Sequence, residues 1–330
     1  MLRAYIRKDD RLVATDVDVA APDLMGGEAV WFSLTDPTKA EDAFVESHLG
    51  IDIPTRAEMD DIEPSARLYN EDGAEFMTIT ALFNSETDEP QKTPITFVLR
   101  HNLLVTVRYA DPKPFRLFER LVSRPTNNVY TSGEKVMLGL IEAIIDRLAQ
   151  LLETTGDEID QISREVFRNK TRNVTRKARD LQEIIERIGK KGDVLTLARE
   201  SLVSIARLSS FHQTYDNGNA KTARELRQEL KVLQRDAAAL SDHAAFLSGK
   251  INFLLDATLG LINLEQNQII KIFSVAAVVF LPPTLVASVY GMNFDVMPEL
   301  HLTFGYPMAI VLMIISAVLP YLFFKRKGWL

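Results

Sequence analysis

Two uncharged segments near the C-terminus constrain this chain more than any other feature. The first is Ile272–Tyr290 and the second is Tyr306–Phe324, and each has 19 consecutive residues without Asp, Glu, Lys or Arg. A helix needs about 20 apolar residues to cross the hydrocarbon core of a bilayer. One such segment also suits a buried helix of a soluble protein. Two of them, close together, favour a pair of membrane-spanning helices at 272–290 and 306–324.

The charges that flank these segments predict their orientation. Lys271 precedes the first segment and a basic tail at 325–330 follows the second, whereas the loop 291–305 contains no Lys or Arg. Positively charged flanks remain on the cytoplasmic side of a membrane. We therefore expect both termini in the cytoplasm and the loop outside. The N-terminus has no apolar segment typical of a signal peptide, which agrees with this orientation.

Residues 131–271 have the spacing of long helices. One helix is predicted from about Glu134 and a second over roughly 174–212. The third has apolar residues at alternating steps of four and three for about five heptads. These positions are Leu226, Leu230, Leu233, Ala237, Leu240, Ala244, Leu247, Ile251, Leu254, Thr258 and Leu261. No proline occurs before Pro282, so this stalk helix is predicted to run from near Thr222 into the first apolar segment.

Residues 1–130 are predicted to form a mixed α/β domain. Short apolar runs separated by turn residues indicate strands, and helical patterns lie near 39–49, 55–62 and 114–123. The expected strands are Leu2–Arg7, Leu12–Asp16, Ala29–Leu34, Phe76–Phe83, Thr96–Leu99 and Leu103–Arg108. No glycine-rich phosphate loop and no nucleophile–base motif occurs, so the sequence does not predict an enzyme.

Charge and cysteine content exclude several classes of function. Residues 1–130 carry 23 acidic and 14 basic side chains, and the rest of the chain carries 22 and 24. An acidic domain is suited to cations and argues against nucleic acid as a partner. The chain has no cysteine, so it has no disulfide, thiolate metal site or cysteine nucleophile.

One face of the first apolar segment is a candidate for ion contact. Steps of three and four place a mostly apolar stripe there, made of Asn267, Ile270, Ser274, Ala277, Leu281 and Thr284. A hairpin of two helices cannot enclose a pore, so a channel requires a homo-oligomer. Thr284 can equally donate to the carbonyl of Phe280 within its own helix. Similarly, Gly291-Met292-Asn293 after this segment is on physical grounds a helix cap and turn.

The C-terminal motifs resemble those of the CorA family of magnesium and cobalt transporters. The likeness is carried by "YGMNF" after a proline-interrupted segment, "MPEL" in the loop, "FGYP" at the second segment and "FKRKGWL" at the end. Matching motif residues are frequent from about Asn252 to the end of the chain. Upstream of Asn252 the likeness is one of architecture, namely an acidic α/β domain followed by long helices. The resemblance implies a funnel-shaped homopentamer in a bacterial inner membrane, with the first span lining the pore.

The resemblance also implies roles for individual residues. Gly291, Met292 and Asn293 would form the entrance ring that receives hydrated Mg²⁺. Asn267 and Thr284 match pore-facing polar positions, and Leu281 lies on the same face. Ile270 and Phe273 fall near the apolar constriction, and Glu299 belongs to an acidic outer loop.

The family is regulated by Mg²⁺ bound between cytoplasmic subunits, which implies a second set of residues. Asp256 on the stalk helix would face an acidic pair of a neighbouring subunit, which here is Asp60 and Asp61, with Asp61 the better match. The alternative is three solvated surface carboxylates. Asp256 interrupts an apolar stretch, where a charge needs a partner.

The expected function is passive Mg²⁺ influx, with passage of cobalt and nickel, gated by intracellular Mg²⁺. A zinc transporter on the same scaffold is one alternative, although zinc prefers nitrogen and sulfur ligands and the five histidines form no sequence cluster. The other alternative is a two-span receptor or scaffold in which the N-terminal domain binds a partner.

Overall fold

The structure is a computed structural model that describes all residues except 9–10, 20–28, 86, 88–89, 125–129, 169–173, 214–219, 293–296, 299–303 and 329–330. The chain divides into two compact units. The first unit combines Met1–Phe167 with Glu186–Leu254, and the second combines Arg168–Ile185 with Leu255–Leu330. Each unit is described by itself.

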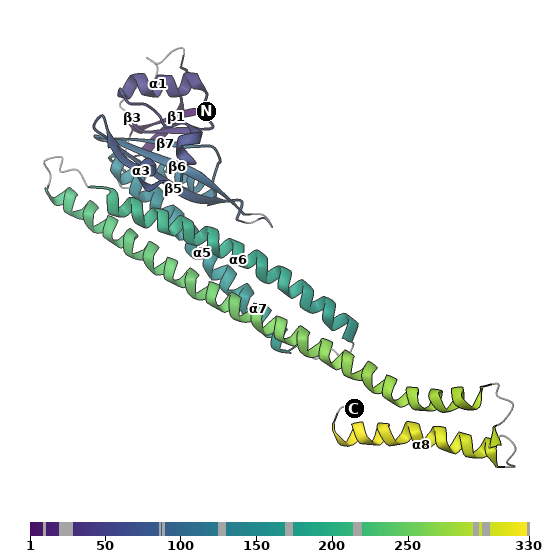
Figure 1. Cartoon of the computed structure of the whole chain (residues 1–330). Coiled ribbons are helices and arrows are strands. Elements are labelled where there is room, and N and C mark those ends of the chain that lie inside the picture. The colour runs from purple at the N-terminus through teal and green to yellow at the C-terminus, as the bar shows by residue number, and fades with distance from the viewer. Residues whose placement is uncertain are drawn as a thin grey trace. The chain divides into compact units, whose positions relative to one another are not determined.

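A seven-stranded sheet forms the centre of the N-terminal part of the first unit (Figure 1). Its strands are β1 Leu2–Lys8, β2 Arg11–Asp16, β3 Ala29–Thr35, β4 Leu68–Glu71, β5 Ala74–Phe83, β6 Gln91–Arg100 and β7 Leu103–Arg108. Their order is β2-β1-β3-β7-β6-β5-β4. All neighbours pair antiparallel except β3 and β7, which pair parallel with Trp31 opposite Leu104. The six predicted strands are confirmed, and β4 was not predicted.

Short helices surround this sheet: α1 Lys39–Leu49, α2 Arg56–Met59, α3 Pro64–Arg67 and α4 Lys113–Val122. Capping boxes start α1 at Thr38 and α2 at Thr55. The helix expected over 55–62 is shorter than predicted, because Asp60 already caps α2. A separate turn of helix, α3, follows before β4, and its four residues are too short for a periodic signal.

The sheet buries apolar side chains on both faces. One cluster joins Leu2, Phe32 and Leu34 to Val45 of α1 and Met59 of α2. A second is aromatic: Tyr5 stacks on Trp31 with ring centroids 4.1 Å apart, and Trp31 meets Phe118 of α4 edge-on. The alternation of side chains along a strand explains why Ala4 and Tyr5 of β1 belong to different faces.

Three long helices follow: α5 Gly133–Arg168, α6 Val174–Phe211 and α7 Ala220–Tyr290. Helix α5 begins against the sheet, because a Cβ at Gly133 would lie 2.4 Å from the backbone nitrogen of Leu104. Within the first unit the three helices pack along one another (Figure 1). Ion pairs join Glu165 to Arg187 and Asp160 to Lys250 across these helices.

The predicted heptad seam is buried over most of its length. Nine of its eleven side chains are buried, and Leu240 and Leu261 are half-buried. Helix α7 runs into the apolar segment, as the sequence predicted, and its helical backbone also continues through Pro282 and Pro283. In the second unit the last part of α7 is followed by α8, Gly305–Arg326. The sequence thus correctly predicted the α/β region, the long helices and the two apolar helices.

Candidate functional site

The last part of α7 and the whole of α8 have large apolar side chains without intramolecular cover. Each helix contains a segment long and apolar enough to cross a membrane. Phe273 is 72% exposed, Phe280 70% and Leu281 66%. Water solvates such a surface unfavourably, so these side chains require lipid or a protein partner. They therefore mark the second unit as the membrane-facing part of the candidate site.

The predicted stripe lies entirely on the last part of α7 and is exposed along its whole length. It comprises Asn267, Ile270, Ser274, Ala277, Leu281 and Thr284. The regular helical backbone places these side chains on one face, as their spacing predicted. Phe273, the other expected constriction residue, is adjacent to this face. The stripe is thus available for contact with another molecule, and the chain itself leaves it open.

Thr284 makes the hydrogen bond within its own helix that the sequence allowed in place of contact with an ion. Its hydroxyl donates to the carbonyl oxygen of Phe280 at 2.8 Å. A hydroxyl satisfied in this way still has acceptor lone pairs. The bond also engages a carbonyl close to Pro282 and Pro283, neither of which can donate an amide hydrogen to the helix. The hydroxyl of Thr284 is therefore satisfied within its own helix and retains an acceptor oxygen on the exposed stripe.

The expected entrance residues lie at the end of α7, and the structure describes two of them. The amide of Gly291 donates to the carbonyl of Ala287 at 2.9 Å, and the amide of Met292 donates to Val289 at 3.4 Å. A Cβ at Gly291 would lie 3.1 Å from that same Ala287 oxygen. Gly291 does not have a left-handed φ, so backbone conformation does not require glycine here. The close contact with the Ala287 oxygen favours glycine instead.

Two of the expected residues lie outside the described part of the chain. These are Asn293, the central residue of the expected entrance ring, and Glu299 of the outer loop. Met292, which precedes Asn293, is 48% exposed. The roles expected for Asn293 and Glu299 therefore stay predictions.

The three expected regulatory carboxylates are exposed, and they belong to two different units. Asp60 and Asp61 follow α2 in the first unit, and Asp256 lies on α7 in the second. The Oδ1 atom of Asp61 accepts from the amide of Glu63 at 3.0 Å, and its carbonyl oxygen accepts from Arg67. These bonds fix the turn that presents Asp60 and Asp61 to solvent.

Within the described residues, no group of three or more His, Asp or Glu side chains is arranged to hold a metal ion. Asp256 has exposed apolar neighbours on α7, Phe253 and Leu259. An exposed carboxylate can hold a cation through its oxygens, although one such group is a weak ligand for Mg²⁺. The regulatory role expected for these carboxylates therefore stays a prediction.

Comparison with known proteins identifies the family of the chain. The family model for the CorA-like Mg²⁺ transporter protein matches residues 26–326. The chain is 37% identical to the magnesium transport protein CorA of Escherichia coli strain K12 over 333 residues, with both chains fully covered. The chain belongs to the CorA-like Mg²⁺ transporter family. It is a member of a transporter family and not an enzyme.

Other CorA proteins are similar over the same length. The magnesium transport protein CorA of Pasteurella multocida is 36% identical over 330 residues, with full coverage of both chains. The solved structure of the CorA magnesium transporter of Methanocaldococcus jannaschii is similar with a TM-score of 0.77 and 20% identity. That comparison covers 100% of this chain and 99% of the other. The likeness in structure confirms the CorA fold: a sheet domain, a long helix and two apolar C-terminal helices.

Sequence reasoning missed a buried ionic cluster in the first unit. His212, just after α6, lies between Glu75 of β5 at 2.5 Å and Glu134 of α5 at 3.0 Å. All three residues are buried. Burial by itself lowers the pKa of His212, but the hydrogen bonds to Glu134 and Glu75 outweigh it and raise the pKa to about 9. The cluster joins three elements, and no spacing rule connects residues 78 and 137 positions apart.

Proposed function

We propose that this protein transports Mg²⁺ as a membrane channel and that it also passes cobalt and nickel. The observation that carries the proposal is its full-length identity of 37% to a magnesium transport protein, together with a family match that spans nearly the whole chain. The two exposed apolar helices supply the part that such a protein places in a membrane. The absence of a nucleotide motif from the sequence agrees with transport that requires no ATP.

The proposed channel is a homopentamer in the shape of a funnel, with α7 lining the pore. Two helices of one chain cannot surround a conduction path, so several copies must contribute. The stripe from Asn267 to Thr284 would face the axis, where Ile270, Phe273 and Leu281 form apolar constrictions. Rings of apolar side chains gate ion passage by excluding water. Exposure of the stripe in the single chain supports this arrangement.

At the outer mouth, five copies of Asn293 would receive the hydrated ion. Mg²⁺ loses its inner-shell waters reluctantly, so a ring of amide oxygens that binds the hydrated ion is suited to it. Gly291 and Met292 would shape this ring, and Glu299 would raise the local concentration of cations. A divalent ion entering across about −100 mV gains roughly 4.6 kcal/mol. This free energy sustains a concentration ratio on the order of 10³.

Regulation would come from Mg²⁺ bound between subunits. Asp61, assisted by Asp60, would share an ion with Asp256 of a neighbouring subunit. The exposure of all three carboxylates supports this proposal, since a shared ion needs ligands that remain accessible. At high internal Mg²⁺ the bound ions would hold the closed state. At low Mg²⁺ the unneutralised carboxylates would repel one another, and the continuous helix α7 would carry the change to the pore.

The proposed location is a bacterial inner membrane, with both termini in the cytoplasm. The basic tail after α8 and Lys271 before the apolar part of α7 support this orientation. Under this orientation the first unit lies in the cytoplasm, where it can sense internal Mg²⁺. The outer loop, which lacks Lys and Arg, then faces the source of the transported ion.

Uptake into liposomes tests the proposal. Purified wild-type protein reconstituted without internal Mg²⁺ is expected to admit Mg²⁺, reported by an internal dye, at a rate that rises with an inside-negative potential. Asn293→Ala is expected to reduce the initial rate at least tenfold, because the entrance ring loses its oxygens. Gln268→Ala is the matched control, since it removes an exposed amide from the face of α7 opposite the stripe.

Two results would contradict the proposal. Wild-type protein that is correctly folded yet admits no Mg²⁺ would exclude a magnesium channel and favour a receptor or scaffold. Uptake of Zn²⁺ with no uptake of Mg²⁺ in the same liposomes would favour the zinc transporter instead.

A further inference from the structure

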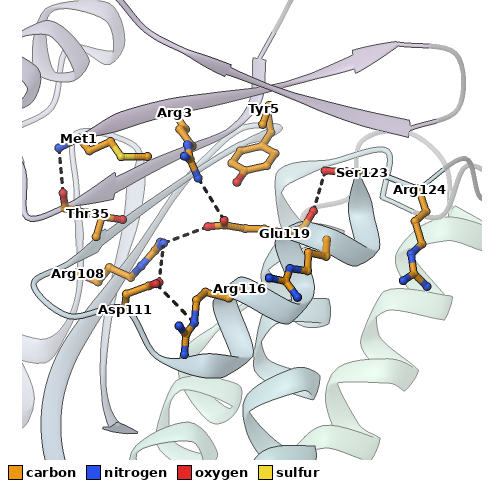
Figure 2. Close-up of a pocket in the computed structure, with 12 residues that line it drawn as sticks. Met1, Arg3, Tyr5, Thr35, Arg108, Asp111, Arg116, Glu119, Ser123 and Arg124 are labelled. Atoms are coloured by element: carbon orange, nitrogen blue, oxygen red, sulfur yellow. Dashed lines mark hydrogen bonds and ion pairs between the residues drawn. The ribbon is translucent and has the colours of Figure 1, made fainter. Parts of the chain in front are cut away.

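A cavity in the first unit gathers arginine side chains, although the region around it is acidic. It has a volume of about 730 Å³ and lies between β1, the end of β7 and helix α4 (Figure 2). Its charged lining residues are Arg3, Arg108, Asp111, Arg116, Glu119, Arg120 and Arg124. We call this cavity the arginine pocket. Its volume is within the range of pockets that bind metabolites, about 300–1,000 Å³.

The net charge of the arginine pocket is opposite to that of its region. Five arginines face two carboxylates in the lining, a net charge of +3, and Asp16 just outside the lining pairs with Arg3 at 2.9 Å. Residues 1–130 together carry 23 acidic and 14 basic side chains, so these five arginines are more than a third of the basic groups in that stretch. A concentration of positive charge in an otherwise acidic region attracts anions to one place.

The two carboxylates hold part of the arginine set in position. Glu119 pairs with Arg108 at 3.0 Å and with Arg3 at 3.5 Å, and Asp111 lies 3.6 Å from both Arg108 and Arg116. Figure 2 shows these side chains pointing toward one another from β1, β7 and α4. Arg108 is further fixed by donation to Ser33 at 2.7 Å and by the ring of Phe115, whose centroid is 4.4 Å away. Such an arrangement is preorganised for a ligand.

One buried polar atom in the lining, the Nε of Arg108, has no hydrogen-bond partner among the described residues, and Arg108 is only 3% exposed. The hydroxyl of the fully buried Tyr5 lies beside the carboxylate of Glu119, and burial together with this carboxylate raises the pKa of Tyr5. A buried donor that makes no hydrogen bond costs free energy, so each such group needs an explanation. Both residues line the same pocket, and the Nε of Arg108 can donate to an anion.

We propose that the arginine pocket binds a soluble anion with several phosphate groups, such as a nucleoside triphosphate or inorganic triphosphate. Guanidinium groups match phosphate oxygens in a bidentate geometry, and positive charge spread over five arginines suits a chain of phosphates. Arg108 would donate from the base of the pocket. Arg116 and Arg120 would close on the anion from the exposed face of α4. The established family membership neither requires nor predicts this site.

A purely structural role is the competing explanation. The ion pairs of Glu119 and Asp111 also attach α4 to β1 and β7, and a folded sheet domain would need them without any ligand. This explanation accounts for Arg3 and Arg108. It does not account for the remaining positive charge of Arg116, Arg120 and Arg124 or for the unpartnered Nε of Arg108, so binding measurements separate the two explanations.

Isothermal titration calorimetry on the full chain in detergent, with all divalent cations removed, provides the test. Removal of Mg²⁺ is essential, because triphosphates chelate Mg²⁺ and would otherwise act through any metal site. Inorganic triphosphate is expected to bind saturably, with inorganic phosphate at least tenfold weaker. Arg116→Gln and Arg120→Gln are each expected to weaken triphosphate binding about tenfold. ATP in a parallel titration shows whether a nucleoside adds affinity to the phosphate chain.

Arg11→Gln is the matched control, because Arg11 is an exposed arginine of β2 outside the pocket. It is expected to bind triphosphate as tightly as wild type. Arg120→Lys keeps the charge and loses the bidentate geometry, so it should also weaken binding, and it serves if a glutamine variant fails to fold. Absence of saturable binding to wild type would overturn the proposal. Equal weakening by Arg11→Gln would overturn it too, since the effect would then be one of net charge.

Discussion

Helix α7 places apolar side chains at helical spacing in two regions and buries them in only one. From Leu226 to Leu254 the seam is buried in the first unit, and Leu247 is 3% exposed. From Ile270 to Leu285 the residues are at least as apolar, yet Ile270, Leu281 and Leu285 are more than 60% exposed. Both regions therefore have the same helical spacing of apolar residues. Their burial differs because only the seam has other helices of the chain to pack against.

This difference separates two sources of stability. The seam packs against α5 and α6, where Leu247 lies 3.7 Å from the position of a Cβ at Gly156, and Ile251 lies 3.8 Å from that of Gly192. Burial there stabilises the fold of a single chain. The lower region buries few side chains within its own chain, of which Val275 at 4% exposed is one, so most of its apolar surface is stabilised by whatever surrounds the chain. Truncation of an apolar side chain should therefore lower the free energy of unfolding in the seam and change it little in the lower region.

The largest expected effect on stability comes from truncation in the seam. Leu247→Ala removes a buried side chain between α5 and α7 and should lower the free energy of unfolding by about 2–5 kcal/mol. Leu281→Ala makes the same chemical change in an exposed part of the same helix and should alter it by less than about 1 kcal/mol. Denaturant unfolding in detergent, followed by the fluorescence of the buried Trp31, measures both variants. Equal losses in the free energy of unfolding for the two variants would contradict this difference between the two regions.

A change of pH should weaken the first unit through His212. The folded pKa of about 9 lies above the ordinary value of 6.5, so this contribution is complete below about pH 6.5 and is lost as pH rises through 9. The loss amounts to about 3 kcal/mol. We expect the midpoint of thermal unfolding to fall between pH 6.5 and 9.5, and this fall should be absent in His212→Gln. The described apolar segments contain no buried titratable side chain, so the same pH change should leave them unaffected.

The smallest effect on stability, and the most specific effect on function, is expected at Asp256. Asp256→Lys replaces one exposed charge by another and should change the free energy of unfolding by less than about 0.5 kcal/mol. Under the proposed regulation it should nevertheless leave Mg²⁺ uptake active at high internal Mg²⁺, where the wild type is inhibited.

Lys250→Glu is a useful comparison for this variant, because Lys250 is also on α7 but pairs with Asp160 in the first unit. It should cost some stability and keep inhibition by internal Mg²⁺. If Asp256→Lys remained fully inhibited, Asp256 would have no part in regulation.

The sequence predicted elements whose signals are local. Alternating residues indicated six of the seven strands, and the seam predicted a helix from near Thr222, which begins at Ala220. Four-residue elements such as β4 and α3 were missed, because they are shorter than one period of either pattern. Spacing also placed the stripe on one face of α7, although it could not distinguish a free Thr284 from one bonded to Phe280.

Features that depend on tertiary contacts had no sequence signal. His212, Glu75 and Glu134 become neighbours only through packing of α6, β5 and α5. The arginine pocket likewise combines Arg3 with residues more than a hundred positions later. Entrance and regulatory roles came from family resemblance alone, since exposed carboxylates and a Gly-Met-Asn turn have ordinary structural explanations.

The first unit is discontinuous along the chain, and this has a consequence for synthesis. Its interior needs Glu186–Leu254 in addition to Met1–Phe167, so it cannot be completed until Leu254 has been made. Domains fold as units while the chain is synthesised from its N-terminus. The first apolar segment begins at Ile272, soon after Leu254. Completion of the N-terminal unit and delivery of this segment to a membrane therefore fall close together in synthesis, so folding and insertion compete in time.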